Sequence, residues 1–241
     1  MADVDVVVIG SGAGGLNAAL GCALAGKSVL VVEQHDRPGG WCHSFPLGGF
    51  EFSPGVHYIG DLDNGGLSQQ LEGLGVAKHL TFLELNPDGY DHVVLGDELR
   101  VDLPKGLPAL RRRLKEAFPH EATGIDRYHD VLAALRTEMT GAMSPPRTKR
   151  VLGSRRVAKA AHALGFPFRA PTLTRWGARP LASLLAAHIT DPKLRAVLSI
   201  QCGNYGLPPS QTPCALHATV TGHYFDGGFY PKGGAMTLPR A

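Results

Sequence analysis

The chain has 241 residues, of which 44% are apolar and 19% charged, so disorder, collagen and coiled coil are disfavoured and one large or two small domains fit. Glycine is enriched at 31 residues without a G-X-Y period, which indicates turns and close backbone approaches. The net charge of +3 is unevenly spread, because nine Lys and Arg and no acidic residue lie between Glu138 and Asp191. A basic block on an otherwise acidic chain predicts an anionic partner, such as a membrane surface or nucleic acid.

The cysteines form no C-x-x-C pair and the histidines show no metal-ligand spacing, so no metal site is expected. The start of the chain lacks the basic region of an export signal, and no run of 18 apolar residues occurs. We therefore expect reduced thiols and a cytoplasmic protein, or one held peripherally on the cytoplasmic face of a membrane.

The first elements in chain order form a βαβ unit. Residues 4–9 and 28–33 are β-branched runs that predict fully buried parallel strands, and residues 13–25 predict a helix that Gly26 caps. The sequence then predicts an extended segment at 50–52, a helix at 66–79, a strand–turn–strand at 80–103, and helices at 106–118, 123–140, 180–189 and 192–200. Pro145 and Pro146 precede the basic stretch, and residues 203–241 are glycine-rich again.

Residues 10–15 (GSGAGG) fit the G-x-G-x-x-G pattern between the first strand and the helix, where the pattern indicates phosphate binding. Gly10 would permit a tight turn, Gly12 a close approach of the pyrophosphate, and Gly15 close packing of helix on strand. Glu33 ends the second strand, where an acidic residue bonds ribose hydroxyls. An acid there favours FAD or NAD over NADP. The bland alternative is an ordinary βαβ turn without a ligand.

Two further glycine-rich segments favour FAD. Residues 37–40 (RPGG) and 48–57 (GGFEFSPGVH) follow Glu33, and a plain nicotinamide dehydrogenase does not need a second such loop. The combination with residues 208–210 (PPS) and 227–234 (GGFYPKGG) resembles the phytoene desaturase-like flavoproteins, in particular their retinol saturase and carotenoid isomerase branch.

The resemblance implies an α/β fold, with a Rossmann-like FAD domain built from 1–60 and 203–241 and a partial α+β substrate domain at 61–202. It implies an FAD-dependent oxidoreductase that saturates, desaturates or isomerises a carotenoid- or retinoid-like polyene by hydride transfer at flavin N5, with NAD(P)H as a candidate electron donor. Cofactor-binding candidates are Gly10, Ser11, Gly12, Ala13, Gly14, Gly15, Glu33, Gln34, Arg37, Gly39, Gly40, Trp41, Gly55, Val56 and His57.

The chain departs from that family in length, because family members are roughly twice as long and carry a further FAD segment near their C-terminus. The sequence therefore predicts a truncated product, or a second chain that supplies the missing C-terminal half. The alternative is a non-catalytic fragment or pseudoenzyme that binds the adenosine–pyrophosphate half of FAD or serves as a membrane-associated interaction module.

His57, Tyr230 and Lys232 are weak catalytic candidates, since each lies in a loop that could approach the flavin; the alternatives are loop packing and a surface lysine. The basic insertion 142–180 is either a membrane-facing patch or a solvated face, and nucleic-acid binding is disfavoured because no recognition motif accompanies it. Residues 111–113 (RRR) are interpreted as a solvated helix face.

Overall fold

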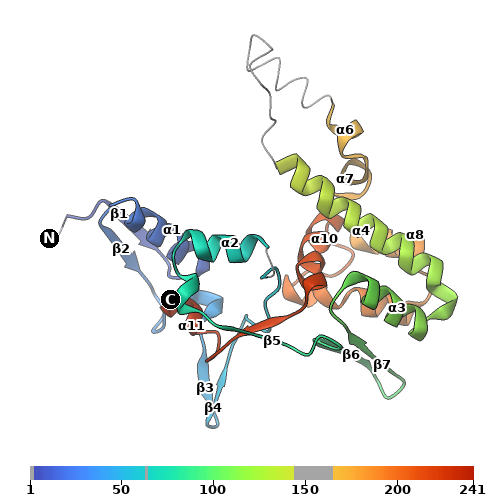
Figure 1. Cartoon of the computed structure of the whole chain (residues 1–241), viewed down its shortest axis with the longest axis horizontal. Coiled ribbons are helices and arrows are strands. Elements are labelled where there is room, and N and C mark those ends of the chain that lie inside the picture. The colour runs from blue at the N-terminus through green and yellow to red at the C-terminus, as the bar shows by residue number, and fades with distance from the viewer. Residues whose placement is uncertain (1–2, 63–64, 144–164) are drawn as a thin grey trace. The chain divides into compact units, whose positions relative to one another are not determined.

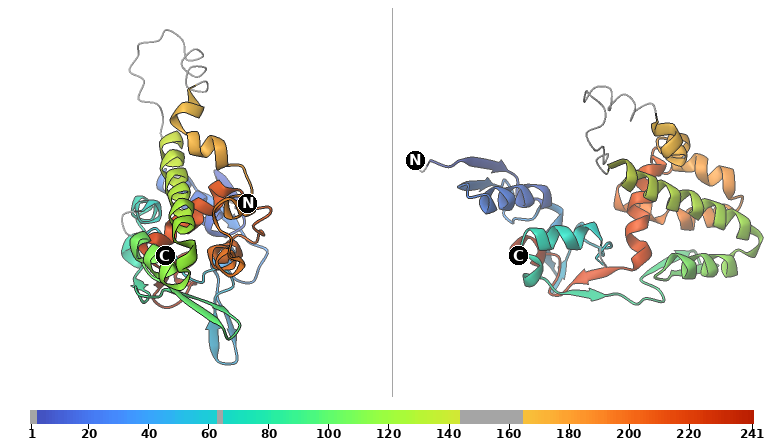
Figure 2. Two further views of the ribbon diagram at one scale, coloured as in Figure 1. Left: turned by 90° about the vertical axis from the view of Figure 1, so that its right-hand side faces the viewer. Right: turned by 45° about the horizontal axis from the view of Figure 1, so that its top comes forward.

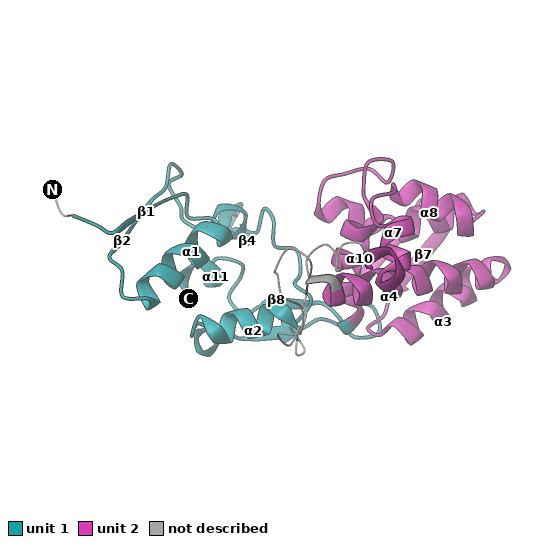
Figure 3. Cartoon of the chain, turned by 90° about the horizontal axis from the view of Figure 1, so that it is seen from above, with its two compact units in different colours: residues 1–90, 226–241 teal, residues 91–225 magenta. Residues whose placement is uncertain are grey.

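The computed structural model describes residues 3–62, 65–143 and 165–241, which divide into two compact units (Figures 1 and 3). Unit 1 comprises Met1–Tyr90 and Asp226–Ala241, and unit 2 comprises Asp91–Phe225. Because packing alone defines these units, the domain division expected from the motifs stays a prediction. Most of the basic insertion 142–180 lies outside the described residues.

Unit 1 begins with the expected βαβ unit, which confirms the Rossmann-like α/β fold class. Strand β1 (Val6–Ile9) pairs in parallel with β2 (Val29–Val32), and helix α1 (Ala13–Leu24) connects them. Gly26 ends the helix with a φ of +78°, a left-handed conformation that suits glycine after a helix C-terminus. The prediction that both strands are fully buried is wrong, because the residues on one face are only half-buried and those on the other are exposed; among the described helices, α1 packs on this sheet.

The rest of unit 1 is built from short elements. A hairpin joins β3 (Phe45–Leu47) to β4 (Phe50–Phe52), which confirms the extended segment at 50–52. The remaining strands and helices are α2 (Gly66–Gly73), β5 (Phe82–Glu84), β8 (Phe229–Pro231) and α11 (Thr237–Arg240). The helix expected over 66–79 ends at Gly73, because Gly75 adopts a φ of +73° and turns the chain before a 3-10 turn at Ala77–His79.

Unit 2 is mainly helical. Its elements are β6 (Asp91–Leu95), β7 (Leu99–Leu103), α3 (Leu107–Ala117), α4 (Ala122–Met143), α6 (Phe166–Arg169), α7 (Pro171–Trp176), α8 (Leu181–His188), α9 (Pro192–Leu198) and α10 (Cys214–His223). Helix α4 lies at the centre, and Figure 2 shows it beside α10. Tyr128, Leu132 and Leu135 of α4 are buried against this neighbourhood, as are Leu181 and Leu184 of α8.

Sequence patterns missed several elements, namely β3, α6, α7, α10, β8 and α11, and α10 is the longest of them. It contains Thr, His and Gly, which have low helix propensity. Tertiary packing overrides that preference, since Cys214, His217 and Ala218 are buried and a side chain at Gly222 would lie 2.8 Å from Cδ of Arg136. The strand pair β6–β7 and helices α3, α4, α8 and α9 confirm the other predicted elements of this unit.

Candidate functional site

The turn between β1 and α1 has the geometry of a phosphate-binding loop. Gly10 has a φ of +94°, and its amide donates to the carbonyl of Val32 at 2.7 Å, so the loop starts from the sheet itself. Gly12 is the N-cap of α1 and no side chain caps the helix, which leaves first-turn amides free of an intrachain side-chain acceptor. Such a helix N-terminus attracts anions through its N–H groups and its partial positive charge.

Gly15 sits where the helix passes closest to the strand. A Cβ at this position would overlap the carbonyl oxygen of Gly10, and would lie 3.1 Å from the carbonyl carbon and 3.5 Å from Cγ1 of Val8. A Cβ at Gly14 would meet nothing within 4 Å. Position 15 therefore requires glycine for packing, as the motif predicted, whereas position 14 does not.

Glu33 closes the far side of the loop. Its carboxylate accepts bonds from the Ser11 amide at 2.7 Å, from the Ser11 hydroxyl at 2.5 Å and from the amide of His35 at 2.9 Å. These donors, with the Ser11 hydroxyl foremost, lower the pKa of Glu33 to about 2. The side chain is thus a fixed anion at the end of β2, and a carboxylate with about four acceptor positions retains capacity for further donors such as ribose hydroxyls.

The second glycine-rich segment lies directly on the first. The amide of Gly39 donates to the backbone carbonyl of Ser11 at 3.0 Å and approaches its hydroxyl at 3.2 Å. A Cβ on Gly40 would come within 2.9 Å of Cα of Gly12, so the two loops touch backbone to backbone. Arg37 directs Nη1 to the carbonyl of Ser44 at 2.7 Å, which anchors this loop internally.

The third glycine-rich segment completes the arrangement. Phe229 and Ile59 exchange backbone hydrogen bonds of 2.7 and 2.8 Å, and the hydroxyl of Tyr230 lies 2.7 Å from that of Ser53. The Met236 amide donates to the Ser44 hydroxyl at 3.2 Å. Segments 10–15, 39–55 and 227–234 therefore meet in one cluster within unit 1, and we call it the glycine cradle.

The other predicted site residues lie in or beside the glycine cradle with varied exposure. Trp41 is 76% exposed, and a Cβ on Gly55 would fall 2.8 Å from Cβ of Trp41, so this glycine permits a close approach. Gln34, His57 and Lys232 are exposed. Ala13 and Val56 line an apolar cavity of about 440 Å³, together with Leu16, Leu20, Ile59, Leu67, Leu71, Leu74 and Leu238 among others.

Sequence reasoning missed the side chains that join the segments. Ser44 belongs to no motif, and Ser53 lies within the segment 48–57 but was not singled out there. Their partners lie 192 and 177 positions away in the chain. It also missed a buried polar network in unit 2, in which His217 lies 2.8 Å from the hydroxyls of both Tyr128 and Tyr205. No local pattern signals either arrangement.

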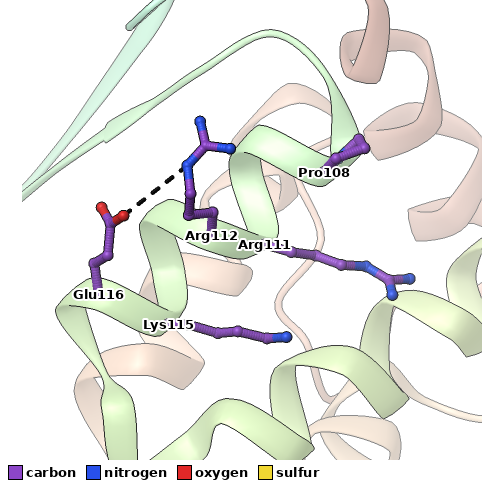
Figure 4. A pocket seen from close by; sticks show the side chains of 5 residues that line it. All are labelled: Pro108, Arg111, Arg112, Lys115 and Glu116. Atoms are coloured by element: carbon purple, nitrogen blue, oxygen red, sulfur yellow. Dashed lines mark ion pairs between the residues drawn. The ribbon is translucent and has the colours of Figure 1, made fainter.

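The charged cluster on α3 is structural. Figure 4 shows Arg111 and Lys115 pointing to the same side of the helix, where they form ion pairs with Asp130 and Asp126 at 2.6 Å each. The interpretation of this cluster as a solvated face is therefore wrong for Arg111, whose side chain is only 23% exposed. Its charge is neutralised within unit 2.

The described part of the basic stretch also serves packing. The guanidinium groups of Arg175 and Arg179 lie 5.3 and 5.4 Å from the ring centroid of Trp176, which is buried. No helix in the described ranges is long and apolar enough to cross a membrane. The same residues contain no group of three or more His, Cys, Asp or Glu that could hold a metal ion.

Comparisons with known proteins agree with this geometry. A family model described as an NAD(P)-binding Rossmann-like domain matches residues 8–72, which contain the end of β1 together with α1, β2 and Glu33. The solved structure of cyclohexylamine oxidase from Brevibacterium oxydans covers 99% of this chain with a TM-score of 0.58 and 21% identity, and the match spans 48% of that protein. The fold and the family match together support a dinucleotide or flavin cofactor.

Curated relatives match nearly the whole chain. All-trans-retinol 13,14-reductase from Danio rerio is 36% identical over 240 residues, 98% of this chain and 38% of the relative. Phytoene dehydrogenase from Streptomyces griseus is 30% identical over 241 residues, and prolycopene isomerase 1 from an Oncidium hybrid cultivar is 27% identical over 250. These matches span 44% and 40% of the respective relatives. The resemblance expected from the motifs is confirmed: the chain is a relative, over part of their length, of the retinol reductases, prolycopene isomerases and phytoene dehydrogenases.

Proposed function

We propose that this chain forms the nucleotide-binding part of an FAD-dependent oxidoreductase that acts on a carotenoid- or retinoid-like polyene. The observation that carries the proposal is the glycine cradle, in which Gly39 and Gly40 pack on the loop 10–15 at the N-terminus of α1 with Glu33 at its edge. The relatives are named for their action on retinol, prolycopene and phytoene, and these names supply the substrate class.

The residues present fit a dinucleotide. The open first-turn amides of α1 would hold the pyrophosphate, and the lack of a Cβ at Gly12 and Gly40 allows backbone to approach it closely. Glu33, ionised at neutral pH, would accept hydrogen bonds from the ribose hydroxyls. The loop from Gly39 to Gly55 extends the cradle beyond these groups, as the longer flavin cofactor requires.

A bound flavin supplies hydride transfer at its N5 position, with NAD(P)H as the proposed electron donor. The protein's share is to orient that ring and exclude water. Tyr230 is held by its bond to Ser53, which supports a positioning role for this tyrosine. His57 and Lys232 are exposed side chains of the second and third segments, and they remain our candidates for groups that touch flavin or substrate.

The proposal is tested by titrating the purified chain with FAD and following flavin absorbance and fluorescence. Replacing Glu33 by Ala removes charge-assisted hydrogen bonds, so the affinity should fall roughly ten- to hundred-fold. Glu72→Ala, at an exposed glutamate of α2 outside the glycine cradle, is the matched control and should leave the affinity unchanged. Equal FAD affinity of the Glu33 variant and the native chain would refute the ribose role, and no binding by the native chain would refute the cofactor assignment.

A further inference from the structure

Ser11 is the residue that connects the first two glycine-rich segments of unit 1 to Glu33. It is only 3% exposed, although it lies in a turn between a strand and a helix. Its hydroxyl donates to Oε2 of Glu33 at 2.5 Å and accepts from the amide of Gly39 at 3.2 Å. Its own amide also donates to Oε2 of Glu33, at 2.7 Å. Both hydrogens that Ser11 can donate are therefore used by Glu33, and neither is left for a ligand.

These bonds make the two carboxylate oxygens of Glu33 unequal. Oε2 accepts both the amide and the hydroxyl of Ser11, which fills its two acceptor positions. Oε1 accepts one bond, from the amide of His35 at 2.9 Å, and retains its other position. The oxygen of Glu33 that can receive a ribose hydroxyl is therefore Oε1.

The same sheet contains a second serine–carboxylate pair that serves for comparison. At the opposite end of β1 and β2, Oδ2 of Asp5 accepts from the amide and the hydroxyl of Ser28 at 2.9 and 3.0 Å. That pair is exposed and joins the beginnings of the two strands. The pair of Ser11 and Glu33 differs in being half-buried and in holding Gly39 of the second glycine-rich segment.

The contacts of Ser11 fix the carboxylate before a ligand arrives. A glutamate without such contacts loses rotamer freedom when a ligand orders it, and this loss weakens binding. Here three bonds from the protein hold the side chain of Glu33 in one position. The same donors, the Ser11 hydroxyl most of all, lower the pKa of Glu33 to about 2, so the fixed side chain is also an anion.

We propose that Ser11 is a positioning residue of the nucleotide site, whose hydroxyl holds Oε2 of Glu33 so that Oε1 receives a ribose hydroxyl of the bound dinucleotide. The inference rests on the proposed function for the class of ligand, and it adds the residue that sets the selectivity for the ribose. Loss of the hydroxyl should reduce this selectivity, whereas a merely structural defect would weaken ligands with and without ribose hydroxyls alike.

The test compares the binding of ADP and of 2′,3′-dideoxy-ADP by calorimetry, because the two probes differ only in the ribose hydroxyls. The native chain should prefer ADP roughly ten-fold or more. Ser11→Ala should reduce that preference by roughly three-fold or more, since Glu33 is no longer held. Ser28→Ala removes the hydroxyl of the comparison pair and should keep the native preference. In a Glu33→Ala background, Ser11→Ala should not change the preference further.

A second measurement needs no ligand. Carbon NMR follows the carboxyl group of Glu33 through a pH titration of the unliganded chain. Ser11→Ala should raise the pKa of Glu33 toward the ordinary value of a glutamate, because the hydroxyl is the largest cause of its depression, and Ser28→Ala should leave it unchanged. Amide exchange of α1 checks that unit 1 is folded in each variant, and Ser11→Cys, with a thiol that donates only weakly, takes the same tests if Ser11→Ala does not fold.

Two results would overturn the proposal. One is a preference for ADP that is the same in Ser11→Ala and in the native chain, including the case in which both probes bind more weakly by the same factor. The other is a pKa of Glu33 that Ser11→Ala leaves unchanged. If the native chain binds neither probe and no FAD, the proposed function fails, and the titration of Glu33 still decides whether Ser11 holds the carboxylate.

Discussion

Replacing Gly15 by Ala tests whether the helix–strand contact builds the glycine cradle. The added methyl would overlap the carbonyl oxygen of Gly10, and that atom belongs to the backbone of the phosphate-binding turn and cannot rotate away. Helix α1 must therefore move off β1, or the turn must change shape. Either movement displaces the open amides at the N-terminus of α1 from the position that an anion would use.

Two opposing effects set the change in the free energy of unfolding for Gly15→Ala. Overpacking a tight site costs about 1–3 kcal/mol, whereas replacing glycine by alanine in a helix gains up to about 1 kcal/mol. We expect a net destabilisation of unit 1 by about 1–2 kcal/mol. Gly14→Ala and Gly21→Ala lie in the same helix, and their Cβ atoms would meet nothing within 4 Å. They should show the gain alone, a stabilisation of roughly 0.5–1 kcal/mol.

Native-state amide exchange of α1 measures this stability locally, which matters because two units need not unfold in one step. FAD titration of Gly15→Ala and Gly21→Ala measures the cradle. Gly15→Ala should weaken binding by roughly ten-fold for each 1.4 kcal/mol lost, whereas Gly21→Ala, outside the cradle, should not. Faster exchange in all three variants would show that α1 does not tolerate any side chain there. If Gly15→Ala shows the same amide exchange in α1 and the same FAD affinity as the native chain, the packing argument itself is refuted.

Burial lowers the pKa of His217 and of His129 to about 4. Both rings are therefore neutral in the folded state at neutral pH. Their contribution to the free energy of unfolding is complete above pH 6.5 and is lost as the pH falls toward 4. Urea titrations should show unit 2 losing up to about 3 kcal/mol per histidine over that window, and His217→Gln should reduce the loss. Leu184 is fully buried, so Leu184→Ala should cost roughly 2–5 kcal/mol in a urea titration and leave FAD affinity unchanged. For the basic stretch 147–179, sedimentation with liposomes should show binding to anionic lipid that salt weakens; equal recovery with neutral vesicles would count against a membrane role.

The βαβ unit could be predicted because each of its signals is local. A β-branched run, a glycine pattern and a terminal glycine lie within thirty residues, and the structure uses Gly10 and Gly26 with the positive φ values that such positions favour. The convergence of the three glycine-rich segments could not be derived this way. The bonds from Ser44 to Met236 and from Ser53 to Tyr230 connect positions far apart in the chain, and a serine in a loop carries no signal of its partner.

Two helices show the other limit of local reasoning. The leucine spacing that predicted a helix over 66–79 holds only to Gly73, because the conformation at Gly75 turns the chain whatever the spacing beyond it indicates. Helix α10 forms despite the low helix propensity of several residues, because the burial of His217 and Ala218 stabilises the helix more than that propensity destabilises it. The backbone conformation of Gly75 therefore ends the first helix, and tertiary packing stabilises the second.

The one wrong expectation about β1 is also the most informative. An uninterrupted apolar run predicts a strand covered on both faces, because each residue of such a strand requires an apolar neighbour. The structure supplies that neighbour for Val6 and Val8 through α1, and leaves Ile9 89% exposed. A strand meant to face water on one side would alternate apolar and polar residues, and β1 does not. The sequence of β1 therefore matches a sheet with a second covering layer.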